Sequence, residues 1–186
     1  EDNWDNISKA ISEGANTVKN WGVTEEHLKS KNSIIPIFYY FYKGGLEKDV
    51  KSIEELKRYF LLSNAINLFG SHGDSVLSNI RESMVNDWKM DRKLKKACFR
   101  FENILTNSYF NSGDKSMKVN DDVINHWIED IKYPDTFFIL YLLYSDKNFD
   151  STIFHQDHIH PQKLFKNREL IDRINSNTLP NLMFLK

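Results

Sequence analysis

The sequence predicts a mainly α-helical protein, with a multi-helix bundle over residues 1–148 and a smaller unit with a β-hairpin over residues 149–186. Three observations predict this. Apolar residues recur at steps of three and four through the first 145 residues, which is the spacing of helices that bury one face. A polar, turn-like stretch follows at 145–150. After it, the β-favouring run 151–155 and the apolar run 182–185 predict two strands.

The sequence predicts three helices in the N-terminal part of the bundle. Residues 4–21 carry one apolar stripe at helical spacing, and Gly22 suits the cap that ends this helix. Thr24 begins a short second helix. The aromatic stretch 33–42 predicts a helix buried on most sides, with Pro36 in the first turn, where proline is tolerated.

The sequence predicts five more helices in the middle of the chain. Ser52 and Glu55 have the spacing of a capping box and predict a helix that begins at Ser52. The run 137–144 is apolar on every face, so its periodicity does not separate helix from strand. The preceding stretch 134–136 looks like a first turn and favours a helix. The five expected ranges are 52–69, 75–88, 94–105, 123–131 and 137–144.

Composition bounds the cellular setting. The formal net charge is −1, from 25 basic and 26 acidic residues, so there is no global attraction to nucleic acid. The longest apolar run has eight residues, whereas a membrane-spanning helix needs about 20. Cys98 is the single cysteine and excludes a disulfide within the chain, which favours a reducing, cytoplasmic compartment.

A histidine cluster at 154–162 is the clearest candidate for chemistry, because three of the chain's six histidines lie inside the six residues 155–160. In one interpretation Asp157 ligates a hard divalent cation and His158 acts as a general base toward water. In another, His155, His158 and His160 belong to a zinc site, although a closed structural site needs four ligands and Cys98 lies elsewhere. In the third, the histidines are structural residues of a strand.

The segment Asp157-His158-Ile159-His160-Pro161-Gln162 resembles the Asp-His-Ile-x-Pro signature of HNH nucleases. It is similar to the HNH domain of RNA-guided CRISPR effectors, and more similar to the C-terminal HNH domain of GmrSD-type, modification-dependent restriction enzymes. Residues 31–44 and 58–81 resemble the helical region before that domain. Residues 175–185 resemble the second strand, which begins with an asparagine before an apolar run.

The resemblance implies a ββα-metal fold and a metal-dependent endonuclease. Such an enzyme hydrolyses phosphodiester bonds in double-stranded DNA, with Mg²⁺ or Mn²⁺, in the restriction of foreign or modified DNA and in phage defence. Asp157 matches the first metal ligand and His158 the general base. Asn181 matches the asparagine that holds the loop between the strands through backbone hydrogen bonds. His155 and His160 are supporting candidates.

Two parts of the family pattern lie outside this sequence. One is the helix after the second strand, which supplies the last metal ligand and is expected beyond Lys186. The other is the N-terminal nucleotide-associated domain with its Asp-Gly-Gln-Gln-Arg motif. We therefore expect a fragment that neither cuts DNA nor binds metal tightly by itself. The alternative is a non-catalytic helical scaffold or interaction module with an unused HNH remnant.

Overall fold

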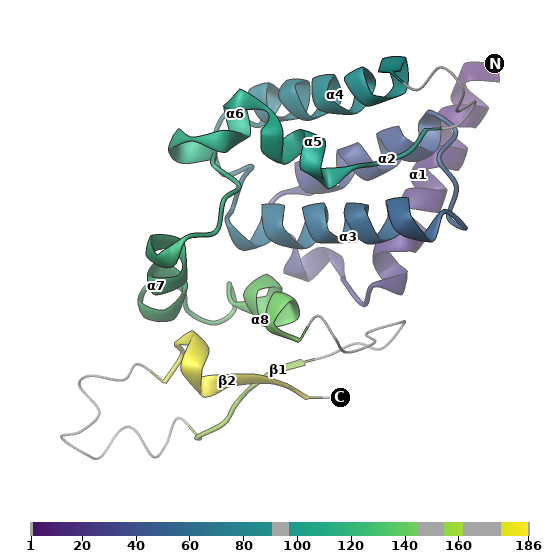
Figure 1. The fold of residues 1–186 in the computed structure, drawn as a ribbon. Coiled ribbons are helices and arrows are strands. Elements are labelled where there is room, and N and C mark those ends of the chain that lie inside the picture. The colour runs from purple at the N-terminus through teal and green to yellow at the C-terminus, as the bar shows by residue number, and fades with distance from the viewer. Residues whose placement is uncertain (1, 91–96, 145–154, 162–175, 186) are drawn as a thin grey trace.

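A computed structural model of the chain describes residues 2–90, 97–144, 155–161 and 176–185. In these ranges the protein is mainly helical and contains a two-stranded antiparallel hairpin near the C-terminus (Figure 1), which confirms the predicted fold class. The predicted unit boundary at 148 lies outside the described residues. None of the described helices combines the length and the apolar character that crossing a bilayer requires.

The elements follow the predicted order. The α-helices are α1 (Asp2–Asn20), α2 (Ile35–Tyr42), α3 (Val50–Ala65), α4 (Gly73–Met90), α5 (Phe101–Thr106), α6 (Ser108–Asn111), α7 (Asp121–Glu129) and α8 (Phe137–Leu143). The short 3-10 helices are η1 (Glu25–His27), η2 (Lys31–Ile34), η3 (Gly113–Lys115) and η5 (Leu179–Asn181). The strands are β1 (His155–His158) and β2 (Leu182–Leu185).

Aromatic side chains of α2, α3 and α8 form the centre of the core. Tyr40, Tyr59 and Phe60 are completely buried. The Phe60 ring packs edge-on against Phe138, with centroids 5.8 Å apart. The run 137–144 is thus largely a buried helix, as predicted, and α8 lies between α3 and the hairpin (Figure 1). This helix positions the hairpin.

The apolar stripe predicted for the first helix is only partly correct. Trp4 and Ile11 belong to that stripe but are 68% and 44% exposed. The buried face of α1 instead runs through Ala10, Gly14 and Val18. The reason is close packing on α2, since a Cβ atom at Gly14 would lie 2.5 Å from the Phe38 ring.

The predicted capping box at Ser52 is wrong. Asp49 caps α3, and its Oδ1 accepts a hydrogen bond from the Ser52 N–H. The Ser52 hydroxyl and the Glu55 carboxylate instead accept hydrogen bonds from the backbone N–H groups of Phe99 and Phe101. These bonds hold residues 97–100 as a non-helical segment against α3, so α5 begins only at Phe101, inside the predicted range 94–105, whose first residues 94–96 lie outside the described ranges.

Replacing Asp49 with alanine should lower the free energy of unfolding by about 1 kcal/mol, because the first turn of α3 loses its cap. Denaturant unfolding measures the change. Glu47→Ala, at an exposed carboxylate three residues before α3, is the matched control. Equal stability of the two variants would contradict the capping role.

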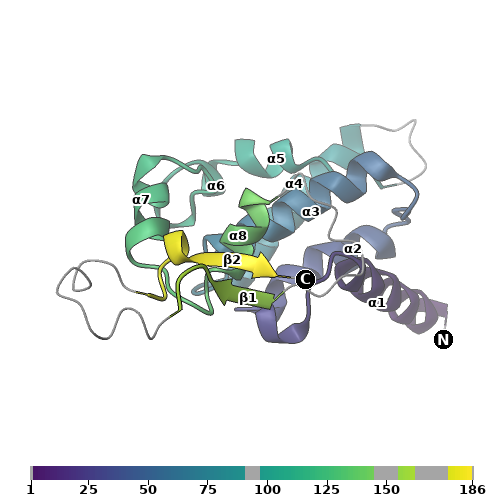
Figure 2. The same cartoon turned by 90° about the horizontal axis from the view of Figure 1, so that it is seen from below.

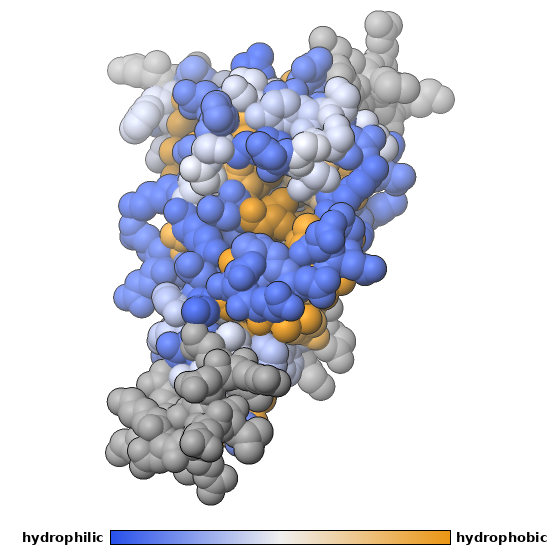
Figure 3. Space-filling model, turned by 90° about the vertical axis from the view of Figure 1, so that its left-hand side faces the viewer, coloured by the Kyte–Doolittle hydropathy of each residue, from blue (hydrophilic) through white to orange (hydrophobic). Residues whose placement is uncertain are grey.

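A cavity of about 760 Å³ lies beside α7. Ile66, Val123 and Trp127 are among its apolar lining residues, and Lys29 and Asp122 are among the polar ones. The face in Figure 3 shows apolar residues near its centre surrounded by hydrophilic ones. Because the cavity carries charges of both signs, it is not a simple anion-binding surface.

Candidate functional site

Strand β1 carries the histidine cluster and pairs with β2 in an antiparallel register. Asp157 lies opposite Met183, and His158 opposite Leu182. This pairing confirms the expected hairpin over the described part of the predicted strand, whose first residues, 151–154, lie outside the described ranges. Figure 2 shows the two strands side by side below α8.

Asp157 and His158 lie on opposite faces of β1. Successive strand residues alternate between the faces, so Asp157 shares its face with His155. Asp157 is exposed, and its Oδ1 accepts a hydrogen bond of 2.7 Å from the His158 N–H. His158 is half-buried. The two residues therefore reach different surroundings although they adjoin in the chain.

Asn181 fixes the backbone that follows β1. It is 3% exposed. Its Oδ1 accepts from the His160 N–H at 2.9 Å, and its Nδ2 donates to the carbonyls of His160 and Ser176 at 3.1 and 2.8 Å. The Asn181 carbonyl also accepts from the Ile159 N–H at 2.8 Å. One buried side chain thus ties both ends of the loop between the strands together.

The His158 ring is held by two residues that the sequence did not single out. Its Nε2 lies 2.9 Å from Asn177 Oδ1, and its ring centroid lies 5.9 Å from that of Tyr133. With the Asn177 oxygen as acceptor, the neutral imidazole has its proton on Nε2 and its lone pair on Nδ1. The contact with Asn177 therefore favours the tautomer with its lone pair on Nδ1.

Gln156 lies on the same face of β1 as His158 and attaches this face to the helical unit. Its Nε2 donates to the Pro134 carbonyl at 3.0 Å, and its Oε1 accepts from the buried hydroxyl of Thr136. On β2, the Phe184 ring packs against Phe137 with centroids 5.3 Å apart. Polar and aromatic contacts together fix the hairpin under α8.

His155 lies close to a further histidine that the sequence did not single out. His27 of η1 stacks on the Phe137 ring at a centroid distance of 3.6 Å, and its Nδ1 accepts from the Thr24 N–H at 3.1 Å. Burial lowers the pKa of His27 from its usual 6.5; Glu26 opposes this change and the neighbouring His155 adds to it. Burial against the aromatic ring therefore favours the neutral form of His27.

The lowered pKa of His27 predicts a loss of stability in acid. As the pH falls below about 6.5, the unfolded chain takes up a proton that the folded ring resists, so the free energy of unfolding decreases. Above that pH the contribution is fully present. His27→Gln should flatten this part of the pH profile in denaturant titrations, with the exposed His72→Asn as matched control. An unchanged slope in His27→Gln would contradict the prediction.

The described residues do not form a complete metal site. Among them, no group of three or more His, Cys, Asp or Glu side chains is placed to hold an ion. The exposed Asp157 carboxylate suits a hard cation as a single ligand. The zinc interpretation needs His155 and His158 together, whereas strand alternation directs them to opposite faces.

Comparison of the sequence with models of known protein families gives no match, and neither does comparison with curated proteins.

Proposed function

We propose that this chain is part of an HNH-type, metal-dependent endonuclease that hydrolyses phosphodiester bonds in double-stranded DNA. One observation carries the proposal. The buried Asn181 side chain binds the backbone of His160 and Ser176, and so fixes Asp157 and His158 where β1 ends. This is the arrangement that the Asp-His-Ile-x-Pro resemblance implies for the asparagine of the second strand.

His158 is the general base in this proposal. Asn177 keeps the proton on Nε2, so Nδ1 can accept a proton from the attacking water. The Tyr133 ring beside the imidazole limits its orientations. A histidine is suited to this step because its usual pKa lies near neutrality.

Asp157 carries the one carboxylate in the described part of the hairpin, and it fits as a ligand for Mg²⁺ or Mn²⁺. A bound cation of this kind polarises the phosphate and stabilises the leaving oxygen. In HNH domains, which this segment resembles, the last ligand comes from the helix that follows the second strand. We accordingly assign no step of the reaction to the metal.

The biological role that fits this chemistry is restriction of foreign or modified DNA in the cytoplasm, in defence against phage. The lone Cys98 agrees with a reducing compartment. A nucleotide-associated domain, N-terminal to these residues in the same polypeptide, is the expected partner.

A plasmid cleavage assay tests the proposal on a polypeptide that carries these 186 residues and the expected C-terminal helix. Cutting should require Mg²⁺ or Mn²⁺ and stop with a chelator. Asp157→Ala should abolish it, whereas Asp114→Ala, at an exposed aspartate outside the hairpin, should not. Undiminished cutting by Asp157→Ala would remove the metal-ligand assignment.

The second candidate is a non-catalytic helical scaffold. Asp157 Oδ1 and His158 Nε2 both bind groups of the hairpin itself, which favours a structural use of these residues. A polypeptide with the C-terminal helix that binds DNA or protein partners but never cuts, with any divalent cation, would support this alternative.

A further inference from the structure

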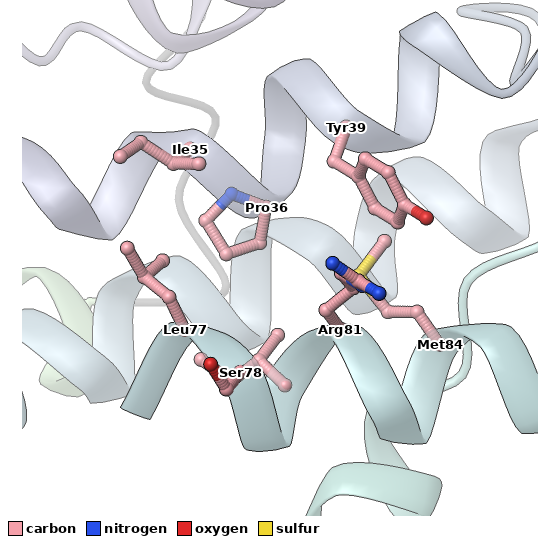
Figure 4. Close-up of a pocket in the computed structure, with 8 residues that line it drawn as sticks. Ile35, Pro36, Tyr39, Leu77, Ser78, Arg81 and Met84 are labelled. Carbon is pink, nitrogen blue, oxygen red and sulfur yellow. The ribbon is translucent and has the colours of Figure 1, made fainter. Parts of the chain in front are cut away.

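A pocket of about 200 Å³ lies between α2 and α4, on another part of the molecule from the hairpin. Figure 4 shows Ile35, Pro36 and Tyr39 from α2 facing residues of α4. Two sequence stretches that were singled out separately, 31–44 and 58–81, meet there. Neither stretch has a part in the proposed cleavage reaction.

The inner surface of the pocket is apolar. Pro36, Ile80 and Met84 are buried and form its floor, while Tyr39 and Leu77 are half-buried. A cavity of about 150 Å³ with apolar walls is large enough to bind benzene. The space therefore suits one benzene-sized ring or a branched alkyl group of similar volume.

One cation lies at the mouth of the pocket. Arg81 and Ser78 are exposed there, and no carboxylate is among the described lining residues. Within the described part of the chain, the Arg81 guanidinium has no ion-pair or hydrogen-bond partner. A planar guanidinium binds a carboxylate through two parallel hydrogen bonds.

We infer that this pocket binds a small organic monocarboxylate, with its apolar ring or alkyl group on the floor and its carboxylate on Arg81. Arg81 is the one cation among the described lining residues, and it matches a single negative charge. A phosphate dianion would leave one charge uncompensated beside an apolar surface, which is unfavourable. The Ser78 hydroxyl is a further donor at the mouth.

An NMR titration of the isotope-labelled chain tests the inference with phenylacetate as the probe and the neutral phenylacetamide as its analogue. Phenylacetate should shift amide signals of α2 and α4 saturably, with a dissociation constant of about 1 mM or below. The amide should bind about tenfold more weakly, because it lacks the charge that Arg81 recognises.

Two variants separate charge recognition from simple apolar contact. Arg81→Gln should remove the preference for the acid, and Ser78→Phe should block both probes by filling the mouth. Arg58→Gln, at an exposed arginine of α3, is the matched control and should bind as the parent does. Three results would each overturn the inference. They are amide shifts that do not saturate, shifts confined to residues outside α2 and α4, and a preference for phenylacetate over phenylacetamide that survives in Arg81→Gln.

Discussion

Replacing His158 with alanine should slow DNA cleavage by about 100-fold to 10,000-fold, the range that a positioned general base contributes. The imidazole is held by Asn177 at 2.9 Å and lies beside Tyr133. Alanine removes the proton acceptor but keeps the backbone pairing of His158 with Leu182. The loss should therefore appear in the cleavage rate and not in the fold.

Single-turnover cleavage of a labelled duplex measures this loss in the polypeptide with the C-terminal helix. His160→Ala is the matched control, because His160 joins the Asn181 hydrogen bonds through its backbone N–H and carbonyl, which alanine keeps. His158→Ala cutting at the parental rate would exclude His158 as the base. Equal losses in both variants would indicate general damage to the hairpin.

Asn181→Ala should lower the free energy needed to open the hairpin by about 2–4 kcal/mol. The substitution removes three side-chain hydrogen bonds and leaves the His160 N–H and the carbonyls of His160 and Ser176 unpaired in part-buried positions. The helical core is formed by other residues and should stay folded. Local opening should therefore precede global unfolding.

Hydrogen exchange at the backbone amides of Ile159 and His160 measures this opening directly. Both N–H groups donate to Asn181 in the native hairpin, so both should exchange much faster in Asn181→Ala. Asn125→Ala, at an exposed position on α7, is the matched control. Unchanged protection of these two amides in Asn181→Ala would contradict the clamping role of Asn181.

Local sequence patterns predicted the fold where local forces decide it. The apolar run 137–144 and the turn before it predicted α8, and the apolar run 182–185 predicted β2. Local patterns failed where a side chain forms hydrogen bonds with backbone groups that are distant in the sequence. Ser52 and Glu55 have capping-box spacing but bind the N–H groups of Phe99 and Phe101, a contact that spacing along one helix does not contain.

The candidate site was predictable to the extent that it lies in one short motif. Asp157 and His158 are adjacent in the sequence, and Asn181 precedes an apolar run. Asn177 and Tyr133 were missed because they reach His158 only through the folded chain, from 19 and 25 residues away. His27 was missed for the same reason, since it is linked to the hairpin through Phe137 of α8, which packs against Phe184.

Chemical rescue of His158→Ala by imidazole tests most directly whether this histidine is the general base. In the presence of Mg²⁺ or Mn²⁺, free imidazole can enter the space that the side chain leaves and accept the proton from water. The cleavage rate of His158→Ala should rise with the concentration of unprotonated imidazole, whereas that of Asp157→Ala should not. A His158→Ala variant that binds DNA and metal normally, yet gains no activity at any imidazole concentration, would contradict the proposal.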